Sequence, residues 1–158
     1  MELKKKDFVE IGSWYGKTTY EIATRHPDKT IYTMDYMGEE LVLDKHTLKH
    51  RVPNIKELCK YGKHLENVKY IYANSHTYDF NKFKNIDFFF VDGDHSFSGV
   101  KIDSEKAMDY LKKNGGGTVA WHDVLTRNLT QVPEYIEFLA ETEDIYYIKN
   151  SNIGYWKI

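Results

Sequence analysis

Two groups of ionisable side chains stand out in this sequence, and each directly follows a short apolar run. Together they comprise Asp92, Asp94, His95, His122 and Asp123. Charged groups at the end of a buried segment are costly unless they bind a ligand or transfer protons. Carboxylates and imidazoles at this density suit a divalent cation or general base catalysis. The alternative is that Asp94 or Ser96 caps the helix that follows, and that Asp123 is also only a cap.

A glycine-containing turn near the N-terminus points to a second kind of chemistry. Gly12 and Gly16 lie four residues apart, between an apolar run and a helical pattern. Such a turn lets a ligand approach the backbone, and the first helical N–H groups can receive an anion. Asp35 ends the next apolar run, about 20 residues further on, where a carboxylate can accept both hydroxyls of a ribose. The combination favours a nucleoside-containing ligand, and a plain glycine turn is the alternative.

These polar groups stand at the ends of segments that alternate between strand and helix patterns. We predict strands at 8–11, 30–34, 68–73, 86–91, 118–121, 144–149 and 153–157, and helices at 18–25, 53–63, 98–113 and 131–141. This alternation predicts an α/β fold: a Rossmann-like, open, mostly parallel sheet of about seven strands with helices on both faces. The last two strands are close enough for an antiparallel hairpin. Residues 37–52 have weak periodicity and many charges, which predicts a surface insertion.

Composition excludes several classes of protein. The chain has 158 residues, 41% of them hydrophobic, and its 24 acidic and 22 basic side chains give a net charge of −2. A nucleic-acid-binding module would carry a positive surplus. The single cysteine, Cys59, excludes an intramolecular disulfide, and we expect it to be an ordinary helix residue. No apolar stretch approaches the ~20 residues that span a bilayer. We therefore expect one cytoplasmic domain over residues 1–158 with no membrane or nucleic-acid partner.

The remaining histidines carry no recognisable pattern. We expect them to be surface residues; they are His26, His46, His50, His64 and His76.

The residues at the predicted strand ends resemble the class I S-adenosylmethionine-dependent methyltransferases. The nearest likeness is to the branch of macrocin-type O-methyltransferases and cephalosporin-hydroxylase-like proteins, and it covers nearly the whole chain. Its most specific part is DFFFVDGDHSFSGVKID followed by GGGTVAWHD. The segment EIGSWYGKTT is similar to the family's E-x-G-x-x-x-G-x-[ST] turn. The resemblance implies a Rossmann-like fold and S-adenosylmethionine as the cofactor.

By position, the resemblance implies a cofactor site built from four segments. Its residues are Glu10, Gly12, Ser13, Gly16, Thr18, Asp35, Tyr36, Asn74, Ser75 and Asp92. The first five would surround the methionine moiety, the next two the ribose, and the Asn74-Ser75 pair the adenine.

The resemblance also implies a metal site. In metal-dependent relatives, the positions of Asp92, His122 and Asp123 hold ligands. Relatives often have two carboxylates or Asp-Asn where this chain has His-Asp, so the sequence departs from the pattern there.

Our interpretation is that the protein uses S-adenosylmethionine to methylate a hydroxyl oxygen of a small molecule, such as a sugar or a natural product. Mg²⁺ assistance of this reaction is a further hypothesis. Asp94 or His95 would take the acceptor's proton. The alternatives are a non-catalytic cofactor-binding domain and a subunit of a larger assembly. The sequence is also compatible with a homo-oligomer. A P-loop is a remote alternative, because GSWYGKT has three residues between its glycines instead of four.

Overall fold

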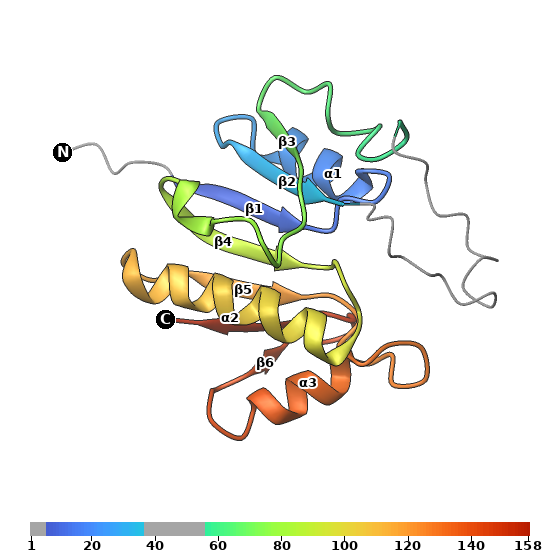
Figure 1. Ribbon diagram of the computed structural model, residues 1–158, viewed down its shortest axis with the longest axis vertical. Helices are drawn as coiled ribbons and strands as arrows, with labels where there is room; N and C mark the ends of the chain where they lie inside the picture. Colours follow the sequence, from blue (N-terminus) through green and yellow to red (C-terminus); the bar gives the residue numbers. More distant parts are fainter. Residues whose placement is uncertain (1–5, 37–55) are drawn as a thin grey trace.

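Seven strands, three α-helices and one short 3-10 helix make up the described part of this computed structural model, residues 6–36 and 56–158 (Figure 1). In chain order they are β1 (Asp7–Ile11), α1 (Lys17–Arg25), β2 (Ile31–Asp35), β3 (Val68–Tyr72), η2 (Phe80–Lys82), β4 (Ile86–Val91), α2 (Phe97–Lys113), β5 (Thr118–Trp121), α3 (Val132–Leu139), β6 (Tyr146–Tyr147) and β7 (Gly154–Lys157). All of the strands belong to a single sheet.

The strand order is β3-β2-β1-β4-β5-β7-β6. The first five strands in sequence are parallel to one another. β7 pairs antiparallel with β5 on one side and with β6 on the other. The predicted mostly parallel sheet with an antiparallel C-terminal hairpin is therefore confirmed. The chain runs outward from β1 to β3 and then returns to β4, and ligands of such sheets bind at this switch point, beyond the carboxyl ends of the strands.

Helices cover both faces of the sheet, as predicted. Val9 and Ile11 of β1 point into the larger core, which α2 and α3 also line. Phe8 and Ala23 belong to a smaller cluster on the opposite face, where α1 packs. Figure 1 shows α2 lying across β4 and β5, its neighbours in the fold. Because successive side chains of β1 point to opposite faces of the sheet, β1 contributes to the cores on both faces.

α2 is the longest helix, and its ends have local causes. The Ser96 hydroxyl accepts a hydrogen bond from the Gly99 amide, which caps the N-terminus. Lys112 and Lys113 stand in the last turn, where they complement the helix dipole. Gly115, with a φ of 92°, ends the helix in the left-handed conformation that glycine tolerates.

The predicted helix at 53–63 is wrong where the structure describes it, from residue 56 onward. Residues 56–64 form consecutive turns, and Cys59 has a φ of 52°, which an α-helix does not allow. The Cys59 amide donates to the carbonyl of Trp14 at 2.7 Å and the Tyr61 amide to that of Tyr15 at 3.0 Å. These amides bond to the turn after β1 instead of to their own segment. The predicted insertion at 37–52 lies outside the described residues.

The C-terminal strands are shorter than the prediction. The strand predicted at 144–149 is reduced to Tyr146–Tyr147, and both residues are exposed at the edge of the sheet. Within residues 6–36 and 56–158, the structure contains no helix with the length and apolar character needed to cross a bilayer.

Candidate active site

The turn after β1 lies against the end of β4 because Gly12 has no side chain. Its φ is 93°, and a Cβ built there would lie 2.1 Å from the carbonyl oxygen of Asp92. Gly16 has a φ of 79°, and its Cβ would lie 2.8 Å from Cys59 Cα. Both positions therefore require glycine for two reasons, conformation and space. The turn and the ionisable residues after β4 belong to one edge of the sheet.

Glu10 lies beneath this turn and is only 1% exposed. The hydroxyls of Thr19 and Thr33 both donate hydrogen bonds to its Oε2 atom. Burial raises the pKa of Glu10 to about 7, against the opposing effect of the two hydroxyls. Sequence reasoning named Thr18, which is exposed, and missed Thr19. Helical spacing could have identified Thr19 as an inward-facing residue, because Thr19 and the buried Ala23 are four residues apart on one face of α1.

Asp35, at the end of β2, holds the glycine turn in place. Its Oδ2 accepts hydrogen bonds from the Ser13 hydroxyl at 3.1 Å and from the Trp14 amide at 2.7 Å. Its Oδ1 accepts from the Tyr36 amide at 2.8 Å. The ring of Tyr36 is 44% exposed and lies beside Tyr72. The residues expected at the ribose therefore lie together, and a carboxylate has lone pairs beyond these three bonds.

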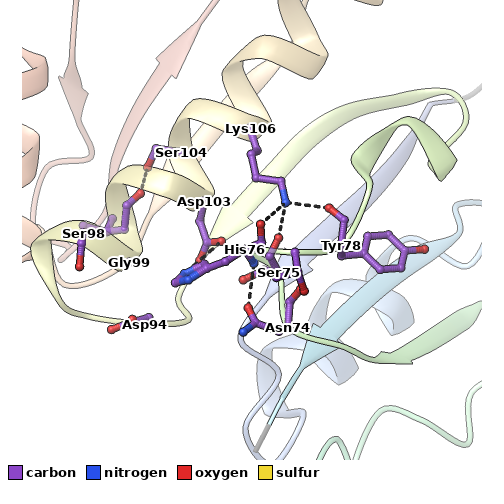
Figure 2. Close-up of polar contacts among 12 residues, drawn as sticks. Asn74, Ser75, His76, Tyr78, Asp94, Ser98, Gly99, Asp103, Ser104 and Lys106 are labelled. Atoms are coloured by element: carbon purple, nitrogen blue, oxygen red, sulfur yellow. Dashed lines mark hydrogen bonds and ion pairs between the residues drawn. The ribbon is translucent and has the colours of Figure 1, made fainter. Parts of the chain in front are cut away.

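Asn74 and Ser75 begin a tight turn after β3 (Figure 2). Asn74 Oδ1, the atom expected to face an adenine amine, accepts a hydrogen bond from the His76 amide at 2.9 Å. An amide oxygen has a second lone pair, so this bond does not fill its capacity. His76 was expected on the surface. Instead it is partly buried, with Nε2 3.8 Å from the carboxylate of Asp103.

The ionisable residues after β4 and β5 meet in one cluster. Ligand atoms of Asp92, His122 and Asp123 all lie within 4.8 Å of one another. His95 Nε2 lies 3.3 Å from Asp92 Oδ1 and 3.8 Å from Asp123 Oδ2. The hydrogen bond to Asp92 raises the pKa of His95, and burial opposes that shift. Two carboxylates and an imidazole in this arrangement have the chemistry of a cation site, with a second imidazole at its rim.

The two proposed helix-cap residues behave differently. Asp94 is exposed, and its Oδ1 accepts a hydrogen bond from the Ser96 amide at 2.9 Å, in the turn that leads into α2. Asp123 has a φ of 60° and accepts from Asn152 Nδ2 at 2.8 Å. Since α3 begins only at Val132, Asp123 caps no helix. The capping alternative is therefore met by Ser96, which caps α2, and it does not fit Asp123.

A shallow pocket lies beside this cluster. It has a volume of about 450 Å³ and is lined by residues 94–96 and 127–131. The loop between β5 and α3 forms its far wall. His95 contributes to this pocket and also contacts Asp92, so one imidazole joins the two features.

A family model described as a methyltransferase domain matches residues 9–124. This range runs from β1 through the loop after β5, so it contains both the glycine turn and the ionisable cluster. The chain belongs to this methyltransferase family. The class I methyltransferase resemblance, the fold and the enzyme class are confirmed, and the P-loop alternative is excluded.

Solved structures of two methyltransferases and of a pre-rRNA processing protein share the fold of this domain. A Staphylococcus aureus protein assigned as a caffeoyl-CoA O-methyltransferase has a TM-score of 0.65 and 20% identity, over 97% of this chain and 75% of that one. The Podospora anserina methyltransferase PaMTH1, bound to S-adenosylhomocysteine, has a TM-score of 0.64 and 18% identity, over 97% and 72%. The Methanococcus jannaschii fibrillarin pre-rRNA processing protein has a TM-score of 0.59 and 16% identity, over 99% and 67%.

No curated protein sequence matches this methyltransferase domain significantly. The structural neighbours include both an O-methyltransferase and an rRNA-processing protein. The fold alone therefore leaves the methyl acceptor open.

Proposed function

We propose that this domain transfers a methyl group from S-adenosylmethionine to a hydroxyl oxygen of a small molecule. The observation that carries the proposal is the position of two sites on one edge of the sheet. The glycine turn with Asp35 lies beside the cluster of Asp92, His95 and Asp123. A cofactor site and a proton-accepting site are thus neighbours.

The residues of the turn fit the proposed cofactor. Gly12 lets the turn pack directly against the carbonyl of Asp92, which holds the turn beside the end of β4. Glu10, Ser13, Gly16 and Thr18 would surround the methionine moiety, with the start of α1 directed toward its carboxylate. Asp35 and Tyr36 would hold the ribose, and Asn74-Ser75 the adenine. The S-adenosylhomocysteine bound to PaMTH1, which has the same fold, supports the choice of cofactor.

S-adenosylmethionine supplies an electrophilic methyl group, and the protein's part is to hold the acceptor in line and remove its proton. The acceptor oxygen gains the methyl carbon as the sulfur–carbon bond breaks, and the hydroxyl proton passes to a base. His95 suits this role, because Asp92 engages Nε2 and leaves Nδ1 for the acceptor. Asp94, the other candidate, accepts the Ser96 amide with one oxygen, and its second oxygen could also take the proton.

We infer that Asp92, His122 and Asp123 can hold a divalent cation that would lower the pKa of a bound hydroxyl. Mg²⁺ prefers oxygen ligands, and this set contains an imidazole nitrogen. Mn²⁺ and Zn²⁺ accept mixed carboxylate and imidazole ligands. A test of cation dependence should therefore include all three ions.

Calorimetric titration with S-adenosylmethionine tests the cofactor proposal. We expect binding with a Kd of about 1 µM to 100 µM. The titration is then repeated in the presence of Mg²⁺, Mn²⁺ or Zn²⁺, and a change in the measured heat would identify a cation that binds. A folded protein that binds no S-adenosylmethionine would refute the proposal.

Substitutions then separate binding from proton transfer. His95→Gln and Asp123→Asn should lower turnover with a hydroxylated acceptor by about 10²-fold or more and leave cofactor affinity nearly unchanged. His64→Gln, at an exposed position away from this edge, serves as the control. Full turnover in both variants would remove these residues from the mechanism.

A further inference from the structure

α2 carries two polar side chains, on its inner face, that the proposed chemistry does not use. Asp103 is 0% exposed, and neither of its oxygens makes a well-formed hydrogen bond. Lys106, three residues further along the same face, reaches back toward the turn after β3 (Figure 2). A buried carboxyl such as Asp103 is costly, so the contacts of this residue and of Lys106 beside it need an explanation.

Lys106 binds the backbone of a single turn. Its Nζ donates hydrogen bonds to the carbonyl oxygens of Ser75, His76 and Tyr78, the last two at 3.1 Å and 2.7 Å. A lysine ammonium has three N–H donors, so this turn uses all of them. The ammonium of Lys106 also lies over the ring of Phe80. The lysine therefore fixes the turn as a unit.

Asp103 faces the same turn and also the loop after β4. The Ser75 hydroxyl and His76 Nε2, the latter at 3.8 Å, face its carboxylate from one side. On the other side, a Cβ at Gly93 would lie 3.4 Å from Asp103 Oδ2. Burial raises the pKa of Asp103 to about 6, while the Ser75 hydroxyl, His76 and Lys106 oppose the shift. One carboxylate thus lies between the two loops.

The turn is also held by its own hydrogen bonds. The amides of Thr77 and Tyr78 both donate to the carbonyl oxygen of Asn74, and the His76 amide donates to the Asn74 side chain. The carbonyls of Ser75, His76 and Tyr78 are left to point toward α2, where Lys106 donates to them. His76 therefore connects Lys106, which binds its carbonyl, to the Asn74 side chain, which its amide binds.

We propose that Lys106 and Asp103 are positioning residues, which hold the turn 74–78 and the loop 92–94 at a fixed separation and so set the affinity and base selectivity of the cofactor site. This rests on the proposed function, in which Asn74 and Ser75 face the adenine. The pair acts from the buried side of both loops, through the backbone of the turn.

The test measures affinity for S-adenosylhomocysteine in four proteins by calorimetry. Lys106→Met keeps the apolar stem and removes the donors, so we expect Kd to rise about tenfold or more. Lys106→Arg keeps a cation with several donors and should recover part of the affinity. Lys113→Met, an equal change at an exposed position of the same helix, should leave Kd within about twofold of wild type.

Base selectivity distinguishes positioning from a loss of stability. S-inosylhomocysteine differs from S-adenosylhomocysteine at position 6 of the base, where Asn74 would bind. We expect the wild type to prefer the adenine form, and we expect this preference to fall toward one in Lys106→Met. A folded Lys106→Met protein with wild-type Kd and wild-type preference would overturn the inference.

Two further results make the outcome decisive. If Lys106→Met does not fold, Asp103→Asn, which preserves the shape of the side chain, takes its place with the same expected rise in Kd and loss of preference. An unchanged Kd and an unchanged preference in Asp103→Asn would then overturn the inference. Failure of the wild-type protein to bind S-adenosylhomocysteine would instead refute the proposed function and the inference together.

Discussion

At the scale of single residues, the buried carboxyl of Glu10 makes the stability of the protein depend on pH. Its pKa of about 7, against an ordinary value of 4.5, means that the folded protein binds the proton more tightly than the unfolded chain does. The associated stability is present below pH 4.5 and is lost as pH rises through 7. Glu10→Gln is neutral at every pH, so it should be more stable than wild type at pH 8 by about 3 kcal/mol.

The measurement is urea unfolding of both proteins between about pH 4 and about pH 8. The difference in unfolding free energy should shrink as pH falls and approach a constant near the acidic end of this range. Glu66→Gln, at an exposed position, should show no such trend. A pH-independent difference between Glu10→Gln and wild type would contradict the assigned pKa.

The need for glycine at position 12 comes from its own backbone conformation and its contact with Asp92. Gly12→Ala would place a methyl group 2.1 Å from the Asp92 carbonyl oxygen, at a φ of 93°. We expect a loss of stability of about 2 kcal/mol or more, with cofactor affinity reduced by at least about tenfold.

Gly115→Ala provides the matched control for this backbone conformation. Gly115 has a φ of 92°, and, apart from its chain neighbours, no described residue has an atom within 4 Å of the position that a Cβ would occupy there. It therefore tests conformational strain alone, which should cost about 1 kcal/mol and leave cofactor affinity unchanged. Equal losses of affinity in the two variants, measured by calorimetry, would show that the contact with Asp92 is unimportant.

At the scale of elements, a single buried hydroxyl joins α2 to β5. Trp121 Nε1 donates to Ser104 Oγ at 2.7 Å, and Ser104 donates to the Val100 carbonyl at 2.5 Å. The side chains of Trp121 and Ser104 are completely buried. Ser104→Ala would leave the indole N–H without its partner, so we expect thermal unfolding to show a loss of about 1–3 kcal/mol.

Trp121→Phe removes the same hydrogen bond from the other side. Because the two residues share one bond, the double variant should cost less than the sum of the single variants. Additive losses would mean that the bond contributes nothing beyond packing.

At the scale of the whole molecule, the sequence predicts the sheet well because strand ends and glycine turns are local signals. Alternating apolar runs sufficed for the mostly parallel sheet and for the meeting of Asp92, His95 and Asp123 at one edge. The turns at 56–64 could not be predicted, since the amides of Cys59 and Tyr61 bond to the carbonyls of Trp14 and Tyr15, which are distant in the sequence. The roles of the two polar residues on the inner face of α2 could not be predicted for the same reason. In the sequence, Asp103 and Lys106 look like ordinary charged residues on the surface of a helix. Only the fold brings them to the turn after β3.

The place of β7 has a consequence for the order of folding. β7 is the last strand in the sequence, yet it lies between β5 and β6 in the sheet. Thr118 pairs with Lys157, and Gly117 and Ile158 exchange backbone hydrogen bonds at 2.9 Å and 3.0 Å. Until residues 154–157 are in place, β5 presents an unpaired edge to other chains. Closing that edge needs contacts between distant parts of the chain, which form slowly. A chain in which β7 has not yet docked is therefore open to aggregation at β5, beside the candidate cation cluster.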